Sequence, residues 1–138
     1  MMSVRLVTPM TATVGHIRAD FVITNYFRDK QVSINALIDT GATEVIVTAD
    51  VARALGFDLE EVSRTPVTVA DGRRVWVPRL RGVELHFGDR SFCSEALVLG
   101  DECMVGVVPL EVMDLVIDPK NQRLITNPAH PDGPLLRA

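Results

Sequence analysis

The sequence has little of what metal, redox and phosphate-binding proteins use. It contains only two cysteines and three histidines in 138 residues. His16, His86 and His130 share no ligand spacing, so no metal site is predicted. The sequence also lacks a Gly-rich phosphate loop, a nucleophile-elbow serine and a Cys–His pattern. We therefore expect neither a metal nor any other cofactor.

Excess positive charge and long apolar runs are also missing. Fourteen Lys and Arg stand against 18 Asp and Glu, a net charge of -4, which disfavours nucleic acid as a partner. No apolar run approaches the roughly 20 residues of a membrane helix, and residues 1–11 do not resemble a signal peptide. Cys93 and Cys103 are interpreted as small buried residues of a reducing compartment. These features predict a cytoplasmic protein that binds no membrane.

The remaining pattern is that of one domain built mainly from β-strands. A short helix is expected after Thr48, which suits an N-cap, and before Gly56, which suits a C-terminal cap. A second helix of little more than one turn is expected over Pro109–Met113, with the proline at its first position. The predicted strands lie within 14–26 (clearest at 21–24), 32–38, 44–47, 67–70, 73–77, 82–87, 92–99, 104–108, 115–118 and 123–125.

One stretch carries chemistry: Ala36-Leu37-Ile38-Asp39-Thr40-Gly41-Ala42-Thr43. An apolar strand ends in a carboxylate, and burying a carboxylate there costs free energy unless neighbouring groups hydrogen-bond it. Gly41 lets the turn adopt unusual backbone angles and lets a second backbone approach closely. Asp, Thr and Gly are also common turn residues, so Asp39 as a plain turn residue remains an alternative. Asp114 and Asp118, the other acids near apolar runs, are interpreted as helix-end and turn residues.

A hairpin is predicted around Asp71-Gly72, because Asp-Gly between alternating residues favours a tight two-residue turn. Read on its own, this is an ordinary surface hairpin. Trp76, the only tryptophan, is interpreted as packing against the body of the protein, with contact to a ligand as the alternative.

The Ile38-Asp39-Thr40-Gly41-Ala42 pattern, with Met104-Val105-Gly106 downstream and the hairpin between them, resembles the retropepsin-like aspartic proteases, especially their small prokaryotic members. The resemblance covers roughly residues 20–125. It implies an all-β fold, a closed barrel of the acid-protease type with one or two short helices. The protease domain would span residues 1–126, followed by a Pro-rich tail over 127–138 that is expected to be loop or disordered.

The resemblance also implies a function. Asp39 would be the catalytic acid, Thr40, Gly41 and Ala42 its supporting loop, Ala70, Asp71 and Gly72 a substrate-covering flap, and Gly106 the downstream glycine. Two carboxylates must share one proton to activate water, and this chain has one such motif. The expected enzyme is therefore a homodimeric aspartic endopeptidase that acts on a peptide or protein substrate.

Three residues depart from the relatives or modify the expectation. Thr43 and Val107 stand where retroviral relatives form an interface ion-pair network, so a different interface is expected, to which 123–125 could contribute a strand. Ala42 offers no hydroxyl to the carboxylate, which predicts activity at milder pH than that of pepsin-like enzymes. The alternatives are a dimeric peptide-binding module of the same fold with little or no turnover, and a monomeric β-barrel domain.

Overall fold

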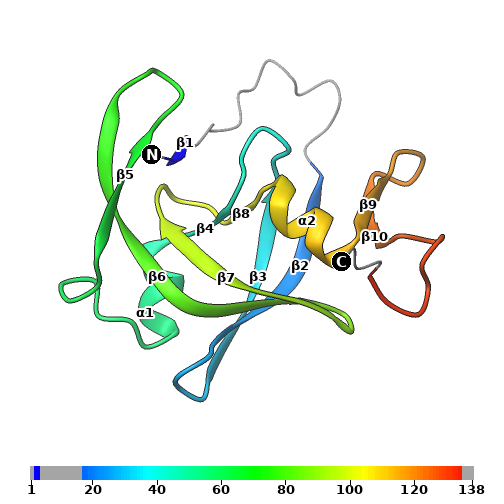
Figure 1. The fold of residues 1–138 in the computed structure, drawn as a ribbon, viewed down its shortest axis with the longest axis horizontal. Helices are drawn as coiled ribbons and strands as arrows, with labels where there is room; N and C mark the ends of the chain where they lie inside the picture. The colour runs from blue at the N-terminus through cyan, green and yellow to red at the C-terminus, as the bar shows by residue number, and fades with distance from the viewer. Residues whose placement is uncertain (1, 4–16, 135–138) are drawn as a thin grey trace, which may run out of the picture.

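The computed structural model describes residues 2–3 and 17–134 (Figure 1). The predicted positions 14–16 and 135–138 lie outside this part of the chain. In order, the elements are β1 (Met2–Ser3), β2 (Arg18–Asn25), β3 (Lys30–Ile38), β4 (Val45–Val47), α1 (Ala49–Ala54), β5 (Arg64–Thr68), β6 (Arg74–Phe87), β7 (Arg90–Val98), β8 (Met104–Val105), α2 (Val107–Met113), β9 (Leu115–Asp118) and β10 (Arg123–Thr126).

Eight strands form one sheet that bends back on itself. Its order is β1-β5-β6-β2-β3-β8-β4-β7, and a further pairing of β6 with β7 joins the run from β6 to β7 into a ring. Strands β5 and β1 continue beyond β6 as an arm, drawn at the upper left of Figure 1. The predicted all-β fold with one or two short helices is confirmed.

Alternating side chains fill the ring with two apolar clusters. The larger cluster contains inward residues of β2, β3, β6 and β7. Both helices add to it, α1 and its C-cap through Ala52 and Leu55, and α2 through Leu110 and Met113. The smaller cluster lies under the β5–β6 arm and consists of Leu37, Ile46, Val67, Val69, Val77, Leu97 and Met104, with Val75 and Leu99 at its edge. The base of the arm is therefore part of the core.

The predicted hairpin forms, but its connection has three residues rather than two. The Gly72 N–H donates to the Val69 carbonyl and the Val69 N–H to the Arg73 carbonyl, which leaves Ala70, Asp71 and Gly72 as the loop. Of these residues only Gly72 has a positive φ, +88°, whereas the predicted two-residue turn of the commonest kind needs two. Asp71 instead accepts hydrogen bonds from the Arg73 N–H and guanidinium, and these hydrogen bonds, the backbone one first, lower the pKa of its carboxyl.

The first helix matches its prediction in detail, and the second does not. Thr48 caps α1 by accepting a hydrogen bond from the Val51 N–H (3.2 Å), and Gly56 follows the helix with φ +86°. Helix α2 begins at Val107, two residues earlier than predicted, with Gly106 as its N-cap. Pro109 is tolerated at the third position because the first N–H groups of a helix have no partner within it.

The strand predictions near the C-terminus are confirmed as an antiparallel pair, β9 with β10. Residues 127–134 contain no helix or strand. As predicted, Asp118 is a turn residue, accepting hydrogen bonds from Lys120 and Asn121, and Asp114 ends α2 with φ 55°. No helix within the described ranges is both long and apolar enough to cross a membrane.

Two side-chain interpretations are wrong. Trp76 is 62% exposed, because it lies on the face of the arm opposite to the partly buried Val75 and the buried Val77. Cys93 is exposed as well, and its thiol donates to the Glu84 carboxylate (3.1 Å), whereas Cys103 is buried as predicted. In both cases the alternation of the strand directs the side chain outward.

Candidate active site

The Asp-Thr-Gly turn joins two strands that lie on either side of β8. Strand β3 pairs with β8 through Leu37–Met104 and Ile38–Val105, and β4 pairs with the opposite edge of β8. The Asp39 N–H continues the first ladder by donating to the Val105 carbonyl (3.1 Å). Residues 39–44, which we call the catalytic loop after the role that the family resemblance predicts for Asp39, therefore start from the end of a strand fixed in the middle of the sheet.

The Asp39 side chain is 8% exposed, and its two oxygens differ in their surroundings. Oδ1 accepts a hydrogen bond from the Gly41 N–H (2.9 Å), which fixes the direction of the carboxylate. Oδ2 is buried and has no hydrogen-bond partner among the described residues. A buried carboxylate oxygen left without a donor is rare in folded proteins, so Oδ2 is an exception that calls for an explanation.

The rest of the catalytic loop separates into buried and exposed positions. Ala42 is buried and donates its N–H to the Asp39 carbonyl (3.0 Å), which closes the turn. Thr40, Gly41 and Thr43 are exposed. The structure therefore brings together all four predicted residues of the loop, with the carboxylate inside and the neighbouring backbone accessible.

Gly106 and the start of α2 hold this loop from the far side. The N–H groups of Gly106, Val107 and Val108 donate to the carbonyls of Glu44 (3.0 Å), Ala42 (2.9 Å) and Thr43 (3.3 Å). A Cβ on Gly106 would lie 2.6 Å from the Ala42 carbonyl oxygen and 2.7 Å from the Glu44 nitrogen. Position 106 therefore needs a glycine because two backbone segments meet there.

Glu44 brings a second acid to the loop. It is partly buried, and burial raises the pKa of its carboxyl, an effect to which the nearby Glu95 carboxylate adds. Arg79 lies 3.2 Å from the Glu95 carboxylate, within ion-pair distance although not aligned for a hydrogen bond. The Glu44 carboxyl therefore ionises less readily than that of an exposed glutamate.

The predicted flap residues lie apart from Asp39. Ala70, Asp71 and Gly72 are exposed at the tip of the arm and make no hydrogen bond to the catalytic loop among the described residues. In Figure 1 the tip of the arm (green) and the catalytic loop (cyan) lie at the same end of the molecule, away from the β2–β3 turn. The structure therefore leaves the tip near the site end without placing it over the carboxylate.

No cluster of His, Cys, Asp and Glu suited to a metal ion occurs in residues 2–3 and 17–134. Sequence reasoning missed the role of Glu44 and of the amides of Val107 and Val108. The acid was visible as a polar residue between the motif and an apolar strand. The amides carry no sequence signal, because any residue other than proline supplies an N–H.

Comparison with known proteins agrees with this geometry. The family model described as "Aspartyl protease" matches residues 24–116, more than half of the chain. The structure of a retropepsin-like aspartic protease from Rickettsia conorii matches with a TM-score of 0.56 and 25% identity, covering 75% of each chain. That of the retroviral protease-like domain of Ddi1 from Leishmania major matches with a TM-score of 0.55 and 16% identity, covering 88% of this chain and 94% of the other.

The comparison with curated protein sequences found no match. The family match includes both Asp39 and Gly106, and the two structures share the arrangement of the sheet. The chain belongs to the aspartyl protease family, with the retropepsin-like fold.

Proposed function

We propose that this protein is an aspartic endopeptidase that works as a symmetric homodimer. The observation that carries the proposal is the Asp39 carboxylate, with Oδ1 held by the Gly41 N–H and Oδ2 buried without a hydrogen-bond partner among the described residues. A single carboxylate cannot act as acid and base in the same step. A second Asp39, brought by a two-fold axis, supplies the missing group.

In the proposed reaction the two carboxylates share one proton because like charges at close range cannot both persist. The ionised Asp39 takes a proton from water as the water attacks the peptide carbonyl carbon. The protonated Asp39 gives its proton to the carbonyl oxygen, so a tetrahedral diol forms without a metal ion. Collapse of this diol, with a proton delivered to the nitrogen, breaks the C–N bond.

The surface around the catalytic loop supports a contact between two chains. Thr40, Gly41 and Thr43 are exposed beside the carboxylate. Val108 and Val112, one helical turn apart on α2, are 38% and 44% exposed, and Val108 follows the residue that bonds Ala42. In the proposed dimer this apolar face of α2 takes the place of the ion pairs that Thr43 and Val107 cannot form.

The tip of the arm, Ala70–Gly72, is proposed as the flap over the substrate. Its exposure, its glycine with positive φ and its position at the site end of the molecule suit a small moving segment. Because Oδ2 is buried in a single chain, catalysis also needs a movement that opens the carboxylate to water and substrate.

The second candidate is a dimeric peptide-binding module of the same fold with little or no turnover. The observation that favours it is the same burial of Oδ2, which keeps water from the carboxylate in the single chain. The two candidates differ in one measurable respect, since only the enzyme loses an activity when Asp39 is neutralised.

The test uses Asp39→Asn, which keeps the shape of the side chain and removes its charge. The pure variant should cleave no peptide of a mixed library. Added in tenfold excess to wild type and allowed to exchange subunits, it should lower cleavage to about a tenth, because most wild-type chains then sit in mixed dimers. Asp50→Asn, at an acid whose side chain is 98% exposed on α1, is the matched control and should cleave normally.

Three outcomes would contradict the proposal. Cleavage by pure Asp39→Asn at the wild-type rate would remove Asp39 from the mechanism. Undiminished cleavage in the mixture, together with a monomer mass in sedimentation, would remove the shared site. A wild-type dimer that cleaves nothing in the library would favour the binding module.

A further inference from the structure

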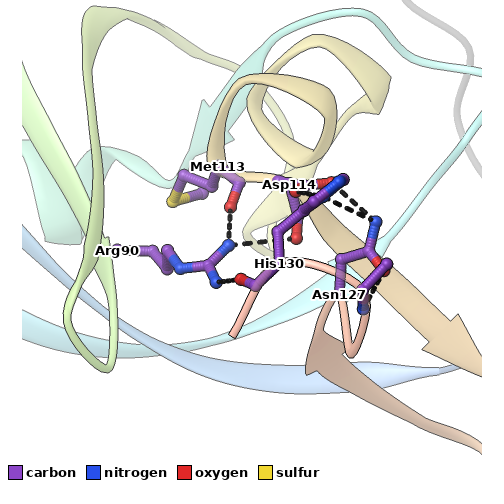
Figure 2. A network of polar contacts seen from close by, with 6 residues as sticks. Arg90, Met113, Asp114, Asn127 and His130 are labelled. Atoms are coloured by element: carbon purple, nitrogen blue, oxygen red, sulfur yellow. Dashed lines mark hydrogen bonds and ion pairs between the residues drawn. The ribbon is translucent and has the colours of Figure 1, made fainter. Parts of the chain in front are cut away.

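A buried arginine lies at the end of α2 away from the catalytic loop. Arg90, the first residue of β7, is 3% exposed, and its guanidinium donates to three backbone carbonyls: Met113 (2.9 Å), Asp114 (3.3 Å) and His130 (2.6 Å) (Figure 2). The first two carbonyls end α2, where the negative end of the helix dipole favours a cation. The third belongs to the segment after β10.

That segment is bound to the same helix end by further contacts. The Asn127 N–H and side-chain amide donate to the Asp114 carbonyl (3.0 Å) and to its carboxylate (3.0 Å). The His130 ring nitrogen Nδ1 lies against the other carboxylate oxygen of Asp114. Figure 2 shows His130 between Arg90 and Asn127 at this helix end. We call Arg90, Asp114, Asn127 and His130 the C-terminal clamp.

Helix α2 connects the clamp to the catalytic loop. Its first N–H groups hold the carbonyls of Ala42 and Thr43, and its last carbonyls are held by Arg90. Between them Pro109, Leu110 and Met113 are buried, so one side of the helix is fixed in the core. A seven-residue helix of about 10 Å, bonded at both ends and packed along one face, transmits a displacement of one end to the other.

We propose that Arg90 is a positioning residue for the reaction at Asp39, acting through α2, and that residues 127–130 belong to the working protease unit. The inference rests on the proposed function for its activity readout. Loss of the guanidinium would remove the bonds of Arg90 to the Met113, Asp114 and His130 carbonyls and leave residues 127–130 held only through Asp114, letting α2 shift along its axis. The carbonyls of Ala42 and Thr43 would move with it, and the Asp39 carboxylate would lose its alignment.

The test compares Arg90→Lys with Arg90→Met. Lysine keeps the cation but not the planar fork that reaches three carbonyls, whereas methionine removes the charge. For protein that circular dichroism shows to be folded, we expect kcat to fall about two- to thirtyfold with KM nearly unchanged, less for lysine than for methionine. Arg53→Met, at an arginine whose side chain is 63% exposed on α1, is the control and should leave both constants unchanged.

Amide hydrogen exchange provides a readout that needs no activity. In Arg90→Lys the N–H groups of Val107 and Val108 should exchange faster, while those of the β2–β3 pair should not change. If Arg90→Met does not fold, Asn127→Ala replaces it. This change loosens the clamp without leaving a buried polar group unpaired. Faster exchange confined to 127–130, with kcat unchanged, would overturn the proposal. If wild type cleaves no peptide, the proposed function fails, and the exchange result alone decides the coupling.

Discussion

Replacing Gly106 by alanine tests whether the catalytic loop depends on close contact between two backbones. A Cβ at this position would meet three backbone atoms, the Ala42 oxygen at 2.6 Å and the Ala42 carbon and Glu44 nitrogen at 2.7 Å. Ordinary contact begins near 3.4 Å, so the segments must separate by several tenths of an ångström. Neither can yield by rotating a side chain, because all three atoms are main chain.

The cost follows from this geometry. Overpacking of a core costs about 1–3 kcal/mol, which for a chain of this size lowers Tm by roughly 3–10 °C. The separation also stretches the bonds from Val107 to Ala42 (2.9 Å) and from Gly106 to Glu44 (3.0 Å), so the loop that carries Asp39 moves. We expect a loss of peptide cleavage well beyond the loss of folded protein, since a displacement of about 1 Å can reduce catalysis a hundredfold.

The measurement combines a thermal melt with a cleavage assay at a temperature where both proteins are folded. Gly88→Ala is the matched control: φ is +58° there and a Cβ would meet nothing within 4 Å, so it tests backbone strain without a clash. It should cost some stability and leave cleavage intact. A Gly106→Ala protein with unchanged Tm and cleavage would refute the close contact.

Two further predictions concern the flap and Glu44. Replacing Ala70-Asp71-Gly72 by a longer flexible loop should strongly reduce cleavage. Tm should change little, because the buried residues of the arm begin at Val69. Cleavage at the wild-type rate would show that the hairpin is ordinary surface structure and not a flap. Glu44→Gln should stabilise the protein at pH values above the ordinary glutamate pKa and have little effect below it, because the raised pKa of Glu44 in the folded state means that its ionisation costs folding stability as pH rises. A urea-unfolding series from pH 4 to 7 measures the difference, and a gain that is the same at both ends would contradict this origin.

Most of the strands and the first helix could be predicted because their signals, caps and alternating or β-branched residues, lie within a few residues of one another. The Thr48 cap and the β-branched run of β2 depend on residues close together in sequence. The motif at Asp39 was recognisable because the chemistry needs those residue types in that order. That Gly106 lies against the same loop is seen only in the structure, in the hydrogen bonds around β8.

The features that sequence reasoning missed depend on distant partners. Helix α2 starts early because its first N–H groups find carbonyls in the catalytic loop, more than 60 positions away in the chain. Arg90 follows a Gly-Asp turn and reads as a solvated residue, and nothing local shows that it is buried under the segment ending at His130. Trp76 does not pack against the body of the protein as predicted, because its strand register directs it outward.

The long strand β6 has a mechanical consequence. Its first part pairs with β5 to form the arm, its second part pairs with β2, and the ladder with β7 changes register between Leu80 and Val83. That irregularity, with Gly82 at φ +75°, bends the strand locally. Swinging the arm about it would pull Val67 and Val77 out of the core, whereas bending only the tip beyond Val69 breaks no apolar contact. The core therefore holds the arm up to Val69 but not its tip, so motion of the proposed flap is cheap only over residues 70–73.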